Sequence, residues 1–203
     1  MPRDSTATKT RILEAATAEF AAYGLAGARV DRLAERAGAN KQLIYAYFGS
    51  KEALFDATMG VHIERLLDAV PFDAYDLPGY AVGLFDFGLA HPELVRLLQW
   101  HRLERPGELS RLEQTLQSTV RKLTALADAQ AAGTVDGTLP PPELLAMVLG
   151  VVQAPDDPAP ASVQVRRQTI AAAVRRLVTP NDRAVHAVGE AGVRAARARP
   201  PGR

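Results

Sequence analysis

The chain has 203 residues, of which 47% are hydrophobic and 23% are charged, so it can bury a core in one large domain or two small ones. It contains no cysteine, which excludes disulfides, thiolate metal sites and cysteine nucleophiles. No apolar run approaches the roughly 20 residues that span a bilayer, and the first residues lack the apolar stretch of a secretory signal, so we expect a soluble, cytoplasmic protein without a membrane partner.

The net charge of +1 is distributed unevenly along the chain. Residues 1–60 carry eight Lys or Arg against seven Asp or Glu, residues 61–182 carry 11 against 15, and residues 183–203 carry five against one. A surface that binds nucleic acid must therefore be local, made by the positions from which cations project.

Helical periodicity separated by short breakers, without sustained alternation, predicts an all-α fold. A first helix is expected over about residues 6–23, with Gly24 as its stop and with one apolar face made by Ile12, Ala16, Phe20 and Tyr23. A second helix is expected over about residues 30–37, with Gly38 as its stop and with an apolar face of Val30, Leu33, Ala34 and Ala37.

The next two helices follow with clear capping signals. Asn40 is a good N-cap for a helix over about residues 41–48, which Gly49 ends. Ser50 caps a long fourth helix that runs to about Pro71, and Glu52 lies in its first turn. Two short helices joined through a glycine turn are the helix-turn-helix pattern.

Five further helices are expected beyond a loop that follows Pro71. Their limits are marked by proline and glycine, at about residues 78–90, 92–104, 107–132, 140–154 and 161–178.

The helix over residues 41–48 carries the chemistry of a DNA-reading element, because the second helix of a helix-turn-helix enters the major groove with its first residues on base edges. Lys41 can donate to guanine and Gln42 can bridge adenine, while Leu43 suits a thymine methyl. The hydroxyls of Tyr45 and Tyr47 suit phosphate oxygens, as does Lys51. Ile44 and Phe48 should face the core.

The alternative is that the aromatic residues are ordinary core and the lysines ordinary solvated charges. The combination of cap, glycine turn, helix length and a stretch without carboxylates between Glu35 and Glu52 favours the DNA interpretation.

Residues 11–59, RILEAATAEFAAYGLAGARVDRLAERAGANKQLIYAYFGSKEALFDATM, closely resemble the DNA-binding domain of the tetracycline-repressor (TetR) family. The resemblance implies an all-α, dimeric transcription regulator whose C-terminal helices dimerise and commonly bind a small effector. The family's DNA-contact positions fall on Arg29, Val30, Lys41, Gln42, Leu43, Tyr45, Tyr47 and Lys51. The family often has Thr at position 29 and Gly or Pro at position 42, so the resemblance implies a different helix cap and a different operator here.

We therefore assign residues 1–55 to a three-helix helix-turn-helix domain that binds DNA. Residues 56–203 are assigned to a C-terminal helical bundle that binds an effector and dimerises. The basic tail from about residue 183 is expected to be a terminal helix, a disordered arm that touches DNA, or a solvated tail.

The helices at about 140–154 and 161–178 are the predicted homodimer interface. Residues 143–153 are polar only at their two ends, so this helix needs cover on more than one side. A partner chain would supply that cover, and a dimer can place two recognition helices about 34 Å apart on a palindromic operator. The alternative is a monomer whose own domain encloses the helix.

An apolar or aromatic effector could bind between the C-terminal helices. Candidate lining residues, for which core packing is the alternative, are Phe85, Leu98, Trp100, His101 and Met147. Tyr80 and Phe87 add aromatic surface near them. The four histidines lack paired ligand spacing, so we expect no metal site, and nothing in the sequence calls for a cofactor.

The sequence thus favours a repressor of double-stranded DNA operators that a small molecule releases. An effector-independent or architectural DNA-binding regulator is the alternative. An enzyme is disfavoured, because the chain has no phosphate loop, nucleophile elbow or metal-ligand pair.

Overall fold

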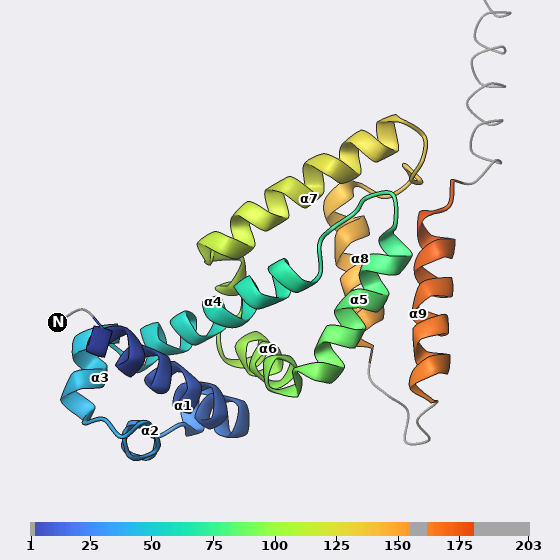
Figure 1. Ribbon diagram of the computed structural model, residues 1–203. Helices are drawn as coiled ribbons and strands as arrows, with labels where there is room; N and C mark the ends of the chain where they lie inside the picture. The colour runs from blue at the N-terminus through green and yellow to red at the C-terminus, as the bar shows by residue number, and fades with distance from the viewer. Residues whose placement is uncertain (1–2, 155–161, 181–203) are drawn as a thin grey trace, which may run out of the picture.

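A computed structural model describes residues 3–154 and 162–180 of the chain. Within these ranges every regular element is a helix, which confirms the predicted all-α fold (Figure 1). The elements are α1 (Arg3–Gly27), α2 (Val30–Ala37), α3 (Lys41–Phe48), α4 (Lys51–Ala69), α5 (Leu77–Ala90), α6 (Pro92–Glu104), the short 3-10 helix η1 (Leu109–Arg111), α7 (Glu113–Ala131), α8 (Pro141–Gln153) and α9 (Val163–Val178).

Local capping explains why α2 ends, and why α3 and α4 begin, where the sequence predicts. Gly38 ends α2 in the left-handed conformation, with φ 59°. The Asn40 side chain then accepts a hydrogen bond from the Leu43 N–H at 2.7 Å, and Ser50 accepts one from the Ala53 N–H at 3.0 Å. The connections between these helices are therefore short, residues 38–40 before α3 and residues 49–50 after it, which holds α3 at a fixed angle on the others.

One hydrophobic core lies beneath the N-terminal helices and continues into the rest of the chain. Phe20 of α1 and Phe55 of α4 are fully buried and meet edge to face, with ring centroids 4.9 Å apart. Leu94 and Leu97 of α6 belong to the same core. The helix-turn-helix therefore rests on α6 as well as on α4.

A second core lies between α5, α7, α8 and α9. Its fully buried members include Leu77, Leu126, Leu144 and Ile170, one from each of these helices. In Figure 1, α5, α8 and α9 run side by side at the end of the molecule farthest from α3.

Two elements differ from the expectation. The helical conformation of α1 breaks at Gly24, as expected, since this residue has φ 68° and ψ −176°, but a further turn that was not expected follows this kink to Gly27. Tyr23, expected on the apolar face of this helix, is 50% exposed, and the Arg32 guanidinium lies over its ring at 4.3 Å from the centroid. The helix expected from residue 107 begins instead at Glu113, because Leu112 is extended after the 3-10 helix.

The predicted basic tail from about residue 183 lies outside the described residues. In the part of the chain that is described, no helix is long and apolar enough to cross a membrane.

Candidate nucleic-acid interface

Helix α3 presents a polar face to solvent and an apolar face to the core. Ile44 is 1% exposed, and the half-buried Phe48 packs against the first core, as expected. Lys41 and Gln42 are exposed, and Tyr45 is 42% exposed. The exposed face thus carries an ammonium, an amide and a phenol, groups that hydrogen-bond base edges and phosphates.

Leu43 and Tyr47 flank this face and are half-buried. The Tyr47 ring packs against the first core and meets the Phe48 ring edge on, with centroids 6.4 Å apart. The Lys9 ammonium lies 5.3 Å from the centre of the Tyr47 ring, so α1 adds a cation beside α3.

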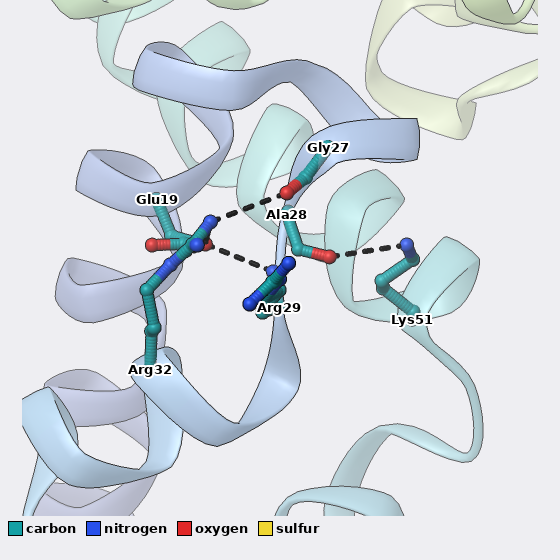
Figure 2. A network of polar contacts seen from close by, with 6 residues as sticks. All are labelled: Glu19, Gly27, Ala28, Arg29, Arg32 and Lys51. Carbon is teal, nitrogen blue, oxygen red and sulfur yellow. Dashed lines mark hydrogen bonds and ion pairs between the residues drawn. The ribbon is translucent and has the colours of Figure 1, made fainter.

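The connection between α1 and α2 is fixed by the buried carboxylate of Glu19, which is 2% exposed (Figure 2). Its Oε1 accepts hydrogen bonds from the Arg29 backbone N–H at 2.8 Å and from the Arg32 guanidinium Nε at 2.9 Å. The same guanidinium donates to the Gly27 carbonyl at 3.2 Å. One ion pair therefore holds both sides of the turn that leads into the helix-turn-helix.

The pKa of Glu19 reflects these contacts. Burial raises it, but the hydrogen bonds from Arg32 and from the Arg29 backbone outweigh burial, and the pKa lies below its ordinary value of 4.5. The carboxylate is therefore charged at neutral pH.

Arg29 and Val30 open α2 in different ways. Arg29 is the N-cap and its side chain makes no cap hydrogen bond, as expected for a residue other than Thr, but Glu19 from α1 satisfies its backbone N–H instead. The Arg29 side chain is exposed. Val30 is only 8% exposed because it packs into the first core, so its side chain offers little surface to DNA.

Lys51 already has a partner within the chain. Its half-buried ammonium donates to the Ala28 carbonyl at 3.2 Å, next to the turn that Glu19 holds (Figure 2). An ammonium has three donors, so two remain for a phosphate.

A carboxylate lies at the exposed surface of α3, although the sequence between Glu35 and Glu52 contains none. Asp31 of α2 reaches Lys41, with 2.8 Å between its Oδ1 and the lysine Nζ. The hydrogen bond and the charge of Asp31 raise the pKa of Lys41. The stretch without carboxylates between Glu35 and Glu52 therefore does not form an acid-free surface, because the neighbouring helix α2 supplies a carboxylate.

The candidate effector residues do not converge on one cavity. Phe85 packs against the second core, whereas Leu98 and Trp100 pack against the first. His101 is 1% exposed and stacks on Phe55 with centroids 5.7 Å apart, while Met147 is 52% exposed at the surface of α8.

Trp100 instead helps to join α6 to the end of α1. Its indole N–H donates to the Ala21 carbonyl at 3.3 Å, and one turn later Glu104 accepts the backbone N–H of Leu25 at 2.5 Å. A Cβ at Gly24 would lie 2.8 Å from both the indole and the Glu104 carboxylate. Glycine is therefore required at the kink by space as well as by its positive φ.

A surface pocket of about 460 Å³ lies between the end of α4 and one face of α5. Tyr80 and Phe87, two of the aromatic residues expected near an effector, line it, whereas the other candidates do not. Its full lining is Ala69, Val70, Pro71, Asp73, Asp76, Gly79, Tyr80, Gly83 and Phe87. Burial raises the pKa of Tyr80 to about 12, so this phenol stays protonated. The glycines at positions 79 and 83, four residues apart on α5, are the sequence signal for this hollow.

No group of three or more His, Asp or Glu side chains in the described ranges is arranged to hold a metal ion.

Comparisons with known proteins connect both parts of the chain to one group of regulators. Residues 12–58 match the family described as "Bacterial regulatory proteins, tetR family", and residues 76–181 match "Tetracyclin repressor-like, C-terminal domain". The chain is 44% identical over 150 residues to the HTH-type transcriptional repressor SCO4008 of Streptomyces coelicolor, an alignment that covers 73% of this chain and 78% of that protein. It is 33% identical over 121 residues to the HTH-type transcriptional repressor NicS of Pseudomonas putida, which covers 55% of each.

Among solved structures, the putative transcriptional regulator SCO4942 from Streptomyces coelicolor is similar to this fold. The superposition has a TM-score of 0.72 at 37% sequence identity and covers 84% of this chain and 98% of that one.

Proposed function

Since the chain belongs to the TetR family and is a DNA-binding transcriptional regulator, we propose that it is a repressor, released from a palindromic operator by a small effector. The observation that carries the proposal is the exposed face of α3, where Lys41, Gln42 and Tyr45 project from a helix that Ile44 anchors in the core. The name of SCO4008 supports repression, since that relative is 44% identical.

Contacts with DNA are divided between base reading and positioning in this proposal. Gln42 and Lys41 read base edges, Leu43 contacts a thymine methyl, and Tyr45 binds phosphate. Arg29 and Lys51 lie at the two sides of the turn that Glu19 holds, where they contact phosphates of the adjacent backbone. Tyr47 contributes its hydroxyl at the edge of the same surface.

The proposed dimer forms through α8 and α9. Leu144, Leu145 and Val148 of α8 are buried within the chain, whereas Met147 is 52% exposed. Exposed apolar side chains continue on α9, at Val163 and Val165, which are 46% and 47% exposed. Burial of such side chains against a second chain would stabilise a dimer, and two copies of α3 could then occupy successive major grooves.

An effector would act through the contact between α6 and α1. The pocket beside α4 and α5 is within the usual size range for small ligands, and α4 belongs to the core that supports α3. A ligand that shifts α4 or α6 would move the turn held by Trp100 and Glu104, and with it the helix-turn-helix.

An effector-independent regulator is the second candidate, because the pocket is open and two candidate lining residues, Phe85 and Trp100, pack against separate cores. The two candidates make opposite predictions about linkage. An effector that weakens operator binding must itself bind more weakly to the operator complex by the same factor, commonly 5- to 150-fold, that is, about 1–3 kcal/mol.

The decisive experiment selects genomic fragments on the purified full-length protein and then measures the affinity of the enriched duplex with and without members of a small-molecule library. Enrichment of a palindrome and its release by one compound, with reciprocal coupling, supports the proposal. Enrichment of no sequence would refute operator recognition, whereas an operator affinity that no compound changes would favour the effector-independent regulator.

A further inference from the structure

The ion pair between Asp31 and Lys41 joins the two helices of the helix-turn-helix at their outer surface. Asp31 lies in the first turn of α2 and Lys41 is the first residue of α3. The carboxylate and ammonium are 2.8 Å apart, and the side chains are 76% and 47% exposed. The pair is thus part of the surface that meets DNA in the proposed function.

This pairing changes what Lys41 can contribute to binding on an arbitrary sequence. Attraction to DNA irrespective of sequence comes from cations that neutralise phosphates and release counterions. Asp31 compensates the charge of Lys41, and its exposed carboxylate faces the same polyanion. The first helix of a helix-turn-helix crosses the phosphate backbone, so a carboxylate in the first turn of α2 is placed where phosphates pass.

Base reading by Lys41 is affected much less. An ammonium has three donors and no acceptor, so a hydrogen bond to Asp31 leaves two N–H groups. These can donate to guanine O6 and N7, which are neutral acceptors and depend less on the net charge of the donor than a phosphate does. Asp31 also restricts the long lysine side chain to positions near the start of α3.

We propose that Asp31 is a specificity-determining residue, which holds Lys41 as a reader of bases and prevents it from acting as a general phosphate contact. The inference rests on the proposed operator binding. Asp31 acts through Lys41 and is a positioning residue.

The test compares Asp31→Asn with Glu35→Gln in the full-length protein. Glu35 is an exposed carboxylate one turn along α2, so its replacement removes the same charge from the same helix without releasing Lys41. Affinities are measured on the duplex enriched by the wild-type protein and on a scrambled duplex of the same length, over a series of salt concentrations. Thermal unfolding of each variant checks its fold, and Asp31→Ser is measured in parallel as a second variant.

We expect Asp31→Asn to strengthen binding to scrambled DNA by about fivefold per subunit near 0.15 M salt and to steepen the salt slope by about 0.9 per subunit. Operator affinity should rise by less, so the ratio of operator to scrambled affinity falls. Glu35→Gln should leave that ratio close to the wild-type value. In a Lys41→Gln background, Asp31→Asn should strengthen binding to scrambled DNA no more than Glu35→Gln does.

Three results would overturn the inference. One is an unchanged specificity ratio in both Asp31 variants, and another is an equal effect of Glu35→Gln, which would indicate net charge alone. The third is a full effect of Asp31→Asn in the Lys41→Gln background. These results can be distinguished from failure of the proposed function, because in that case the wild-type protein itself would enrich no sequence.

Discussion

Replacement of Glu19 by glutamine should destabilise the protein by about 2 kcal/mol at neutral pH. The carboxylate is 2% exposed and accepts hydrogen bonds from the Arg29 N–H and from Arg32. A hydrogen bond to a charged group contributes about 1.5–3 kcal/mol, and glutamine retains a neutral acceptor worth about 1 kcal/mol. Its new N–H₂ group would be buried beside a guanidinium, so the loss is not recovered.

Urea unfolding at fixed protein concentration measures this loss, with Glu14→Gln as the control. Glu14 is an exposed carboxylate on the same helix, and its replacement should change stability by less than about 0.5 kcal/mol. For a chain of this size the Glu19 variant should melt roughly 4 to 8 °C below the wild type.

The pH dependence gives the stricter test. The folded-state pKa of Glu19 is lowered, so its charged form stabilises the fold above about pH 4.5, and this stabilisation is lost as the pH falls below that value towards the folded-state pKa. The difference in unfolding free energy between wild type and Glu19→Gln should therefore be constant between pH 7 and pH 5 and shrink below 4.5. A difference near zero at pH 7, or one that grows on acidification, would refute the assigned role of this carboxylate.

Four further substitutions test the DNA surface, the kink and the dimer. Lys51→Ala should weaken binding to all sequences and reduce the salt slope by about 1, whereas Gln42→Ala should relax discrimination at one operator position by about 1–3 kcal/mol. Both variants are measured on a panel of operator variants, and a uniform loss of affinity in both would contradict the division between positioning and base-reading residues. Gly24→Ala should lower the free energy of unfolding in urea by at least about 2 kcal/mol, because the φ of 68° disfavours a side chain and the added Cβ would lie 2.8 Å from α6 side chains. A variant as stable as the wild type would contradict the close packing of α1 on α6. Met147→Glu should raise the dimer dissociation constant at least tenfold in sedimentation velocity, since a carboxylate would be buried unpaired. The matched change at Leu103 of α6, which is 75% exposed, should leave the dimer intact, and equal effects of the two would argue against an interface on α8.

The helix-turn-helix could be predicted closely because its signals are local. Asn40 and Ser50 each cap a helix by binding an N–H three residues away, and Gly38 ends one through its own backbone conformation. A sequence contains such information within a single turn of helix. The bounds of α2 and α3 therefore match the expected ones.

The contacts that orient these helices could not be predicted, because their partners lie far apart in the sequence. Glu104 binds the Leu25 N–H across 79 positions, and no periodicity connects the two. The burial of Glu19 could have been predicted, since it falls on the buried face of α1 between Ala16 and Phe20. A charged residue at such a position indicates a buried ion pair. Asp31 lay outside the stretch taken for the DNA surface, and only the packing of α2 on α3 brings it to Lys41.

Residues that line a ligand cavity are difficult to predict from this sequence for a different reason. Aromatic and apolar side chains at helical spacing occur equally in a core and in a ligand cavity, and here Phe85, Leu98 and Trp100 all pack into cores. The pocket beside α5 is marked by residues that lack side chains, Gly79 and Gly83. Tyr80 and Phe87 line the same pocket, so the spacing of apolar residues does not distinguish the lining of a hollow from ordinary core packing.

Helices α1, α4 and α6 share one core, and this limits how the DNA-binding domain of this regulator can be exchanged with that of another. A fragment that ends within α4 would expose the rings of Phe20 and Phe55 where Leu94 and Leu97 now cover the same core. A hybrid that joins this DNA-binding domain to the C-terminal domain of another regulator should therefore keep residues of this chain through Glu104. Otherwise the other regulator must have leucines at the positions of Leu94 and Leu97 in its own sixth helix. The segment needed to transfer DNA specificity is thus about the first hundred residues, roughly twice the length of the DNA-binding domain assigned to residues 1–55.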